Sequence, residues 1–221
     1  MSHVETPWVV GSRPVRNPVP DLNALKKVVP QALTRFARGH VHWLADPQGR
    51  LFLFKMLPRG SVGAEIGVWK GDFSKLLLRR VRPTEFHLID PWALVTDASY
   101  SEARYSKAKQ EEMDAMHQSL VETLGRHPGV AIHRESSMEA ARRFDDAHFD
   151  WVYIDGDHTY EGVRGDLVAW VPKVKAGGLV MCDDYVEGQW FQGGVKRAVD
   201  EYVAEKNLPV TIRANQAILK V

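Results

Sequence analysis

The sequence predicts an α/β protein built on a mostly parallel β-sheet with helices on both faces. Short apolar segments alternate with segments of helical periodicity from residue 62 onward, and Gly or Pro residues separate them. Repeated β-α-β alternation gives a parallel, doubly wound sheet, because each crossover helix packs back onto the sheet. With 221 residues, of which 44% are apolar and 26% are charged, the chain suits one such domain with a sizeable core.

Residues 1–58 precede this alternation and are expected to form an N-terminal arm with short helices. Prolines recur through residues 1–20, which predicts an extended arm there. Helical spacing of apolar residues predicts helices at 21–29 and 31–38, and a further short helix is expected at 46–56. Such a segment would act either as a lid over a site or as a contact between protomers. The domain itself is expected to span residues 59–221.

Seven strands are expected, each a short segment of apolar and β-branched residues bounded by turn formers. They are Val62–Ile66, Glu85–Ile89, Val130–His133, Phe149–Ile154, Leu179–Cys182, Pro209–Arg213 and Ala217–Val221. The fifth is expected to follow a Gly177-Gly178 turn. The last two are separated by a turn at 214–216, which predicts an antiparallel hairpin.

Five helices are expected between these strands, because helix-forming residues recur there at helical spacing until Gly or Pro interrupts them. They are Asp72–Arg80, Ser101–Leu124, Ser137–Phe144, Tyr160–Val171 and Val195–Glu205. The second is the longest and most charged, and it stops at Gly125 and Pro128. The fourth ends at Pro172.

Charge and composition narrow the range of partners. Lys+Arg number 29 and Asp+Glu number 28, so the formal net charge of +1 gives no indication of a nucleic-acid or membrane-surface partner. One cysteine, Cys182, excludes an intrachain disulfide framework and a multi-cysteine zinc site. No apolar run approaches the roughly 18 residues of a membrane span. A cytoplasmic location is therefore expected.

Two features after the first two strands are typical of nucleotide-binding sheets. Gly67 and Gly71 flank a turn into a helix, where backbone can approach a ligand closely. The spacing is neither G-x-G-x-x-G nor a P-loop, so a tight turn with no ligand stays open as an alternative. Asp90 ends the second strand 25 residues after Glu65. An acidic residue there commonly holds ribose hydroxyls, and a helix cap is the other interpretation.

Three carboxylates follow the fourth and fifth strands: Asp155, Asp183 and Asp184. Ends of neighbouring parallel strands meet at one edge of the sheet, so these side chains are expected to converge. Carboxylates placed so close together resist ionisation unless a cation is present. Oxygen ligands suit Mg²⁺, with Mn²⁺ or Ca²⁺ as alternatives, rather than zinc.

These segments together resemble the class I S-adenosylmethionine-dependent methyltransferases. Within that class, the chain is most similar to metal-dependent O-methyltransferases of the macrocin and novobiocin sugar type, and more distantly to catechol O-methyltransferase. The resemblance covers roughly Val62 to Val221. It rests on the following segments, in this order: Glu65–Gly71, Leu88–Pro91, Ile154–Tyr160, Lys175–Gly178 and Asp183–Tyr185. It implies a Rossmann-like sheet of seven strands, mostly parallel, with an antiparallel last strand.

The resemblance also implies roles for particular residues. The cofactor S-adenosylmethionine would be held by Glu65, Gly67, Gly71, Ser74, Asp90, Ser137, Met138 and Asp155. Within this group Asp90 would bind the ribose, and Ser137 and Met138 would face the adenine. Asp155, Asp183 and Asp184 would hold the metal. Asp184 matches the sugar enzymes, whereas the catechol enzyme has Asn at that position.

The resemblance leaves two candidates for the catalytic base. His158 stands where catechol enzymes have Lys, and some sugar enzymes use His there. Other sugar enzymes use an Asp at the position of Asp157. Histidine has an ordinary pKa near 6.5, which suits proton transfer at neutral pH better than an aspartate near 3.9. We therefore expect His158 to be the base, with Asp157 orienting or replacing it.

The resulting hypothesis is a Mg²⁺-dependent O-methyltransferase acting on a hydroxyl of a sugar, polysaccharide or glycosylated metabolite. The expected partner is a small-molecule or oligosaccharide acceptor. Assembly into a homo-oligomer is left open. An O-methyltransferase that acts on a catechol or other phenol is the alternative enzyme. A nicotinamide-dependent oxidoreductase on the same architecture is disfavoured by the G-x-x-x-G turn and the clustered aspartates.

Overall fold

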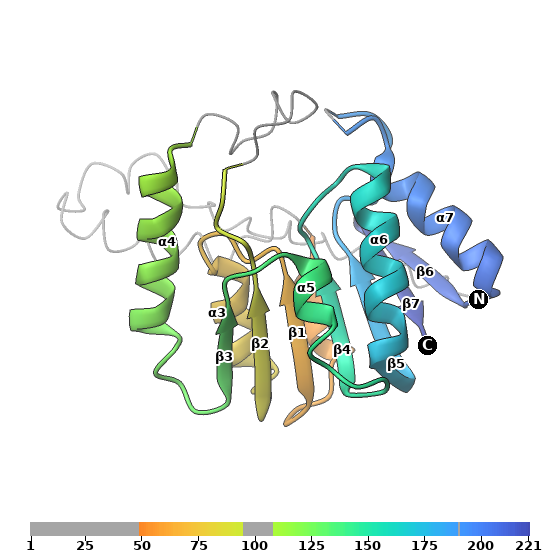
Figure 1. Ribbon diagram of the computed structural model, residues 1–221. Helices are drawn as coiled ribbons and strands as arrows, with labels where there is room; N and C mark the ends of the chain where they lie inside the picture. The colour runs from red at the N-terminus through yellow and green to blue at the C-terminus, as the bar shows by residue number, and fades with distance from the viewer. Residues whose placement is uncertain (1–48, 95–107, 190) are drawn as a thin grey trace, which may run out of the picture. The chain divides into compact units, whose positions relative to one another are not determined.

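The computed structural model describes residues 49–94, 108–189 and 191–221, which lie within one compact unit, Asp46–Val221. The arm at 1–20, the two helices expected within residues 21–38 and residues 101–107 of the long charged helix lie outside the described residues. Within the described residues, seven strands form one sheet in the order β3-β2-β1-β4-β5-β7-β6 (Figure 1).

The strands match the predicted segments closely. Their bounds are β1 Val62–Ile66, β2 Glu85–Ile89, β3 Val130–His133, β4 Phe149–Ile154, β5 Val174–Cys182, β6 Val210–Arg213 and β7 Gln216–Lys220. The first five pair in parallel, whereas β7 pairs antiparallel with both β5 and β6. The predicted fold class, a mostly parallel seven-stranded sheet with an antiparallel last strand, is confirmed.

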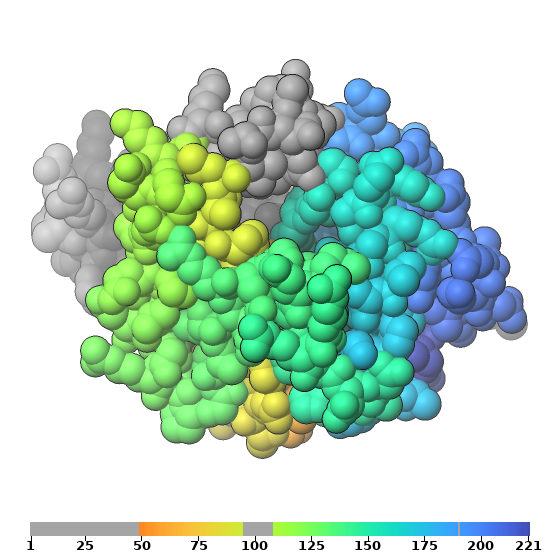
Figure 2. Space-filling view, viewed as in Figure 1, coloured from red at the N-terminus to blue at the C-terminus, as the bar shows by residue number. Residues whose placement is uncertain are grey.

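Helices cover both faces of this sheet, as predicted. They are the 3₁₀ helix η1 Leu51–Lys55, α3 Asp72–Arg80, α4 Gln110–Thr123, α5 Ser137–Ala141, α6 Tyr160–Trp170, the 3₁₀ turn η3 Val171–Lys173 and α7 Gly194–Lys206. One hydrophobic cluster joins α5, α6 and α7 to the sheet, and a second joins η1, α3 and α4 to it. Side chains of α4, α5 and α6 cover much of the face seen in Figure 2.

Alternation along β4 explains how one strand serves both clusters. Trp151 and Tyr153 are fully buried against the α3 side, whereas Val152 and Ile154 are buried against the α6 side. Successive side chains of a strand point to opposite faces, so the apolar run from Trp151 to Ile154 indicates burial on both. At roughly 25 cal/mol per Å² of apolar surface, this two-sided burial is the main stabilisation of the central strand.

The structure corrects several local predictions. The helix expected at 46–56 is only η1, and the helix expected over 101–124 begins, among the described residues, at Gln110. Gly177 and Gly178 do not form a turn before β5 but lie inside it, in an irregular stretch where the pairing with β4 shifts between Phe149 and Trp151. Gln216 is not a turn residue; it is the fully buried first residue of β7. The helix expected over 137–144 ends at Ala141, because the following residues make tighter turns with bonds to Glu139, Ala140 and Ala141.

Backbone hydrogen bonds align the carboxyl ends of five strands. Amide nitrogens just beyond one strand donate to the last residue of its neighbour: Gly67 to Ile89 at 2.9 Å, Asp155 to Ile66 at 2.8 Å, Asp183 to Ile154 at 3.0 Å and Asp90 to His133 at 3.2 Å. The residues that follow β1, β2, β4 and β5 are therefore held at one edge. Among the described residues, no helix is long and apolar enough to span a membrane.

Candidate active site

The turn from β1 into α3 brings backbone from two strands into close contact. Gly67 has a left-handed φ of +85°, and a Cβ there would lie 2.1 Å from the Asp155 carbonyl oxygen. Only glycine meets both demands without strain. Gly71 is the residue that precedes and caps α3. The predicted turn thus exists, with its backbone packed against the segment that follows β4.

Below this turn lies a buried carboxylate. Glu65 is 2% exposed, and burial raises its pKa to about 8. Among the described residues, its Oε2 atom and the hydroxyl of the fully buried Ser74 make no well-aligned hydrogen bond, although the hydroxyl lies near enough to Glu65 to lower its pKa in part. Buried polar groups are nearly always well bonded, so this pair of buried side chains beside a glycine turn is compatible with a place for a polar ligand.

Asp90 binds the backbone of the same turn. Its Oδ2 accepts from the amides of Val68 at 3.0 Å and Trp69 at 2.8 Å, and its Oδ1 accepts from Trp92 at 2.7 Å. Burial raises the pKa of this carboxyl, and the three amides act in the opposite direction. A carboxylate offers about four acceptor positions, so Oδ1 retains room for one more donor.

The two residues predicted to face adenine have different surroundings. The Ser137 hydroxyl donates to Asp166 and accepts from Trp170 Nε1 at 2.8 Å, which ties α5 to α6. Burial raises the pKa of Asp166 to about 7. Met138, by contrast, is 43% exposed. Its side chain is available to a ligand, whereas the Ser137 side chain has a packing role.

The three predicted metal carboxylates do converge. Asp155 Oδ2 and Asp183 Oδ2 lie 3.0 Å and 2.9 Å from one nitrogen, Nη1 of Arg50. Asp155 Oδ1 and Asp184 Oδ2 lie 3.5 Å and 3.2 Å from Nε2 of His158. The carboxylates therefore share two cationic side chains, a pattern that offsets their mutual repulsion.

Arg50 was not foreseen from the sequence. It lies immediately before η1, with its guanidinium 4.3 Å from the Phe73 ring centroid and 3.0 Å from the Tyr153 hydroxyl. Burial lowers the pKa of Arg50, but Tyr153, Asp155 and Asp183 together outweigh that effect and raise it above its ordinary value. No spacing pattern marks this residue, because its partners are more than 100 positions away in the sequence.

His158 packs under Phe191, with ring centroids 5.2 Å apart. Burial alone would disfavour its imidazolium form, but Asp155 and Asp184 outweigh that effect and raise the pKa of His158 to about 10. With these partners, the imidazole ring is protonated and positively charged at neutral pH. In this state it can release a proton but cannot take one up. Asp184 itself has a left-handed φ of +54°, which directs its carboxylate toward the ring.

Asp183 is the most buried of the three carboxylates, and its surroundings fix its orientation. Its side chain is 4% exposed, and burial together with the neighbouring Asp155 raises its pKa to about 7. Its Oδ1 accepts from the Asp184 amide at 2.8 Å and from the Gln216 side chain. Gln216 was missed as a site residue because the sequence places it in a turn. The Asp157 side chain accepts from the Thr159 amide at 2.8 Å, which shapes the turn into α6.

This donor set suits a hard divalent cation. Three carboxylates that share neighbours within 3.5 Å supply the oxygen ligands that Mg²⁺, Mn²⁺ and Ca²⁺ prefer. Arg50 Nη1 contacts two of them, so a cation and this guanidinium would compete for the same oxygens. Glu65 Oε2, Ser74 Oγ and the Gly67 turn similarly fit the polar part of a cofactor.

Comparisons with known proteins bear on the family and the fold. A family described as "Methyltransferase domain" matches residues 64–185. The uncharacterized protein y4gI of Sinorhizobium fredii is 24% identical over 159 residues, which are 71% of this chain but only 16% of that protein. The chain thus spans a small part of the length of this relative.

Two solved structures share the fold. The O-methyltransferase NovP has 21% sequence identity and a TM-score of 0.52, covering 76% of this chain and 74% of NovP. A SAM-dependent methyltransferase from Aquifex aeolicus has 14% identity and a TM-score of 0.52, covering 91% and 97% of the two chains. At these identities the similarity establishes the fold.

Proposed function

The chain belongs to the methyltransferase-domain family, and we propose that it transfers a methyl group from S-adenosylmethionine to a hydroxyl of a sugar, polysaccharide or glycosylated metabolite, with Mg²⁺ as cofactor. The predicted resemblance to class I methyltransferases is confirmed by the family match and the shared fold. The observation that carries the proposal is the convergence of Asp155, Asp183 and Asp184 with His158, beside the glycine turn.

The glycine turn and its neighbours would bind the cofactor. Glu65 and Ser74 offer buried oxygens to the charged methionine portion, where an ammonium group would favour the ionised form of Glu65. Asp90 has acceptor capacity left on Oδ1 for a ribose hydroxyl. Gly67 and Gly71 allow the backbone to approach, and Met138 lies exposed for contact with the adenine.

Asp155, Asp183 and Asp184 would hold the divalent cation. When bound, the cation would lower the pKa of an acceptor hydroxyl and help to fix its position. Gln216 and the Asp184 amide keep the Asp183 carboxylate oriented, so this ligand is preorganised. Alignment of the acceptor oxygen behind the activated methyl group is the main contribution expected of these residues.

His158 would take the proton from the acceptor hydroxyl. Its pKa of about 10 reflects two neighbouring carboxylates, and a cation shared by those carboxylates would weaken this effect and bring the pKa closer to neutral. The base role therefore depends on the cation. Asp157, whose carboxylate shapes the adjacent turn, would keep the His158 segment in place or serve as the base itself.

Two features favour a sugar over a catechol acceptor. Asp184 supplies a third carboxylate where catechol enzymes have Asn, and His158 stands in place of their Lys. NovP, with the same fold, is an O-methyltransferase. Catechols are therefore the second acceptor class to examine.

The test is transfer of labelled methyl from S-adenosylmethionine to a panel of glycosides and catechols, with Mg²⁺ and with EDTA. We expect transfer to a glycoside, and its loss in EDTA. Metal-dependent transfer to catechols alone would replace the sugar assignment, and transfer unaffected by EDTA would remove the metal from the mechanism.

Asp183→Ala separates the metal from the cofactor. This change removes the most buried carboxylate of the set, so methyl transfer should fall at least about 100-fold. Binding of S-adenosylhomocysteine, measured by calorimetry, should change little. Full activity in this variant would contradict the metal assignment. Loss of both properties together would show that Asp183 supports the fold rather than the metal.

A further inference from the structure

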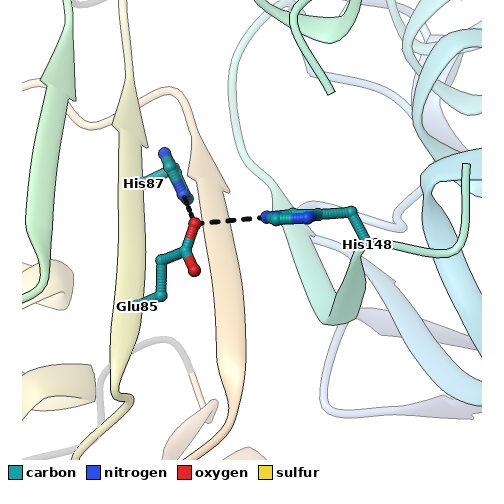
Figure 3. A group of neighbouring side chains, drawn as sticks. All are labelled: Glu85, His87 and His148. Atoms are coloured by element: carbon teal, nitrogen blue, oxygen red, sulfur yellow. Dashed lines mark hydrogen bonds and ion pairs between the residues drawn. The ribbon is translucent and has the colours of Figure 1, made fainter. Parts of the chain in front are cut away.

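A second group of potential metal ligands lies at the opposite end of the sheet from the candidate active site. Glu85 and His87 are on β2, and His148 directly precedes β4. Figure 3 shows their side chains pointing toward one another from either side of β1. One potential ligand atom from each lies within 4.8 Å of the other two.

The distances fit a tetrahedral transition-metal ion. Glu85 Oε1 lies 2.7 Å from His87 Nε2 and 3.2 Å from His148 Nε2. Ligand atoms about 2.0 Å from a tetrahedral zinc ion are themselves about 3.3 Å apart. The two imidazole nitrogens lie within 4.8 Å of each other, so rotation of exposed side chains would have to bring all three atoms to coordination distance.

The hydrogen bonds of the neighbouring imidazoles are compatible with a cation at this position. His87 Nδ1 lies 2.9 Å from His133 Nε2, and His133 Nδ1 faces Glu135 Oε1 at 3.5 Å. If both rings are neutral and the hydrogen of His133 is on Nδ1, facing Glu135, then His133 Nε2 is an acceptor and His87 Nδ1 is a donor. His87 Nε2 then carries a lone pair that faces the Glu85 carboxylate. In that tautomer two acceptors lie 2.7 Å apart, and a cation between them would satisfy both; in the opposite tautomer His87 Nε2 donates its own hydrogen to Glu85.

We propose that Glu85, His87 and His148 form a binding site for a transition-metal ion of the zinc type. Two imidazoles and one carboxylate are a common zinc ligand set with a fourth position open to water. His133 supplies the hydrogen bond that fixes the coordinating tautomer of His87, as outer partners of metal-bound histidines commonly do.

The proposed site is packed against aromatic side chains on one side and is accessible to solvent on the other. The ring of His87 packs edge-on against Phe144 and Phe149, with centroids 4.7 and 5.7 Å apart, and its side chain is only 9% exposed. The side chains of Glu85 and His148 are 44% and 32% exposed, which leaves a route for an ion. A bound ion would link β2 to the segment before β4 across the start of β1.

Cobalt(II) titration of untagged, chelator-treated protein tests this site directly. Cobalt replaces zinc in nitrogen-containing sites and absorbs visible light there, so its spectrum reports the coordination and zinc competition reports the affinity. We expect one equivalent of cobalt with these bands, displaced by zinc. His148→Gln and Glu85→Gln should each weaken binding about 100-fold, and His133→Gln by about 10-fold to 100-fold.

Two controls separate this site from other causes. His127→Gln changes a histidine on the surface, outside the cluster, and should bind cobalt like the unchanged protein. Asp184→Asn alters the candidate active site and should leave these bands in place. The proposal is overturned if the unchanged protein shows no stoichiometric binding, if His148→Gln binds equally well, or if the bands disappear only in Asp184→Asn.

Discussion

At the scale of single residues, Arg50 has the most direct consequence for metal binding. Its Nη1 atom lies 3.0 Å from Asp155 and 2.9 Å from Asp183, two of the proposed metal ligands. Removing the guanidinium in Arg50→Ala should therefore tighten Mn²⁺ binding, by about 10-fold if one charged hydrogen bond of roughly 1.4 kcal/mol is lost. Calorimetric titration with Mn²⁺ measures this change.

Lys55→Ala is the matched control, because Lys55 is an exposed cation in the adjoining helix η1. It should leave Mn²⁺ affinity unchanged. Weaker Mn²⁺ binding in Arg50→Ala would reverse the interpretation, since Arg50 would then organise the carboxylates for the ion rather than compete with it.

Asp166 should make the stability of the protein depend on pH. Burial raises its folded-state pKa to about 7, from an ordinary value of 3.8. The folded protein thus holds this proton more tightly than the unfolded chain does. The associated stabilisation is complete below roughly pH 4 and is lost as the pH rises through about 7. It amounts to a few kcal/mol, on the order of 1.4 kcal/mol for each pKa unit.

Urea unfolding of Asp166→Asn at roughly pH 5 and pH 8 measures this contribution. The amide cannot titrate, so the free energy of unfolding should fall less between these two values than it does in the unchanged protein. Asp145→Asn, at an exposed position, should keep the original pH dependence. Equal pH dependence in all three proteins would show that Asp166 is already ionised in the fold.

At the scale of elements, the glycine turn after β1 combines two constraints that can be separated. Gly67→Ala would place a Cβ 2.1 Å from the Asp155 carbonyl oxygen and would also put Ala at a φ of +85°. Gly177→Ala has a nearly equal φ of +83°, but no atom lies within 4 Å of the added Cβ. We expect Gly177→Ala to cost about 1–2 kcal/mol, because only the left-handed conformation is penalised.

Gly67→Ala should lower the free energy of unfolding clearly more than Gly177→Ala does. It should also weaken binding of S-adenosylhomocysteine. The strand ends at β1 and β4 must move apart to admit the methyl group. Denaturant unfolding and calorimetry of both variants measure the two effects. Equal destabilisation of the two variants, with cofactor binding intact, would show that the ends of β1 and β4 can move apart at little cost.

The strands and helices were largely predictable from the sequence, because each depends mainly on the residues within it and at its ends. β1, β2, β3 and β4 have the predicted bounds, because each is an apolar segment enclosed by turn formers. The convergence of Asp155, Asp183 and Asp184 was also predictable, since parallel strands end at a common edge.

The remaining site residues depend on contacts that no local pattern encodes. Arg50 reaches Asp183 across 133 positions, and Gln216 reaches the same carboxylate across 33. Gln216 belongs to β7, which lies between β5 and β6, so its position follows from the strand order. The irregularity at Gly177 likewise results from pairing between β4 and β5, whereas its sequence alone is typical of a turn.

At the scale of the whole molecule, this strand order brings residues from both ends of the described chain together in the candidate site. Arg50 precedes the first strand and Gln216 begins the last, and both contact Asp183 at the carboxyl edge of β5. A ligand at this edge would therefore touch residues from most of the sheet. Its binding should stabilise the domain as one unit.

Thermal unfolding with S-adenosylhomocysteine tests that coupling. A ligand at about 100 times its Kd stabilises the folded state by about 2.7 kcal/mol, which corresponds to an increase in Tm of roughly 5–10 °C for a domain of this size. We expect this increase with S-adenosylhomocysteine and none with NAD. Asp90→Ala should lose most of it, because Asp90 both shapes the turn and has acceptor capacity for the ribose. Asp72→Ala, at a side chain that is 84% exposed, should keep it. An increase with NAD alone would favour the nicotinamide-dependent alternative, whereas an equal increase in Asp90→Ala would place the ribose elsewhere on the edge.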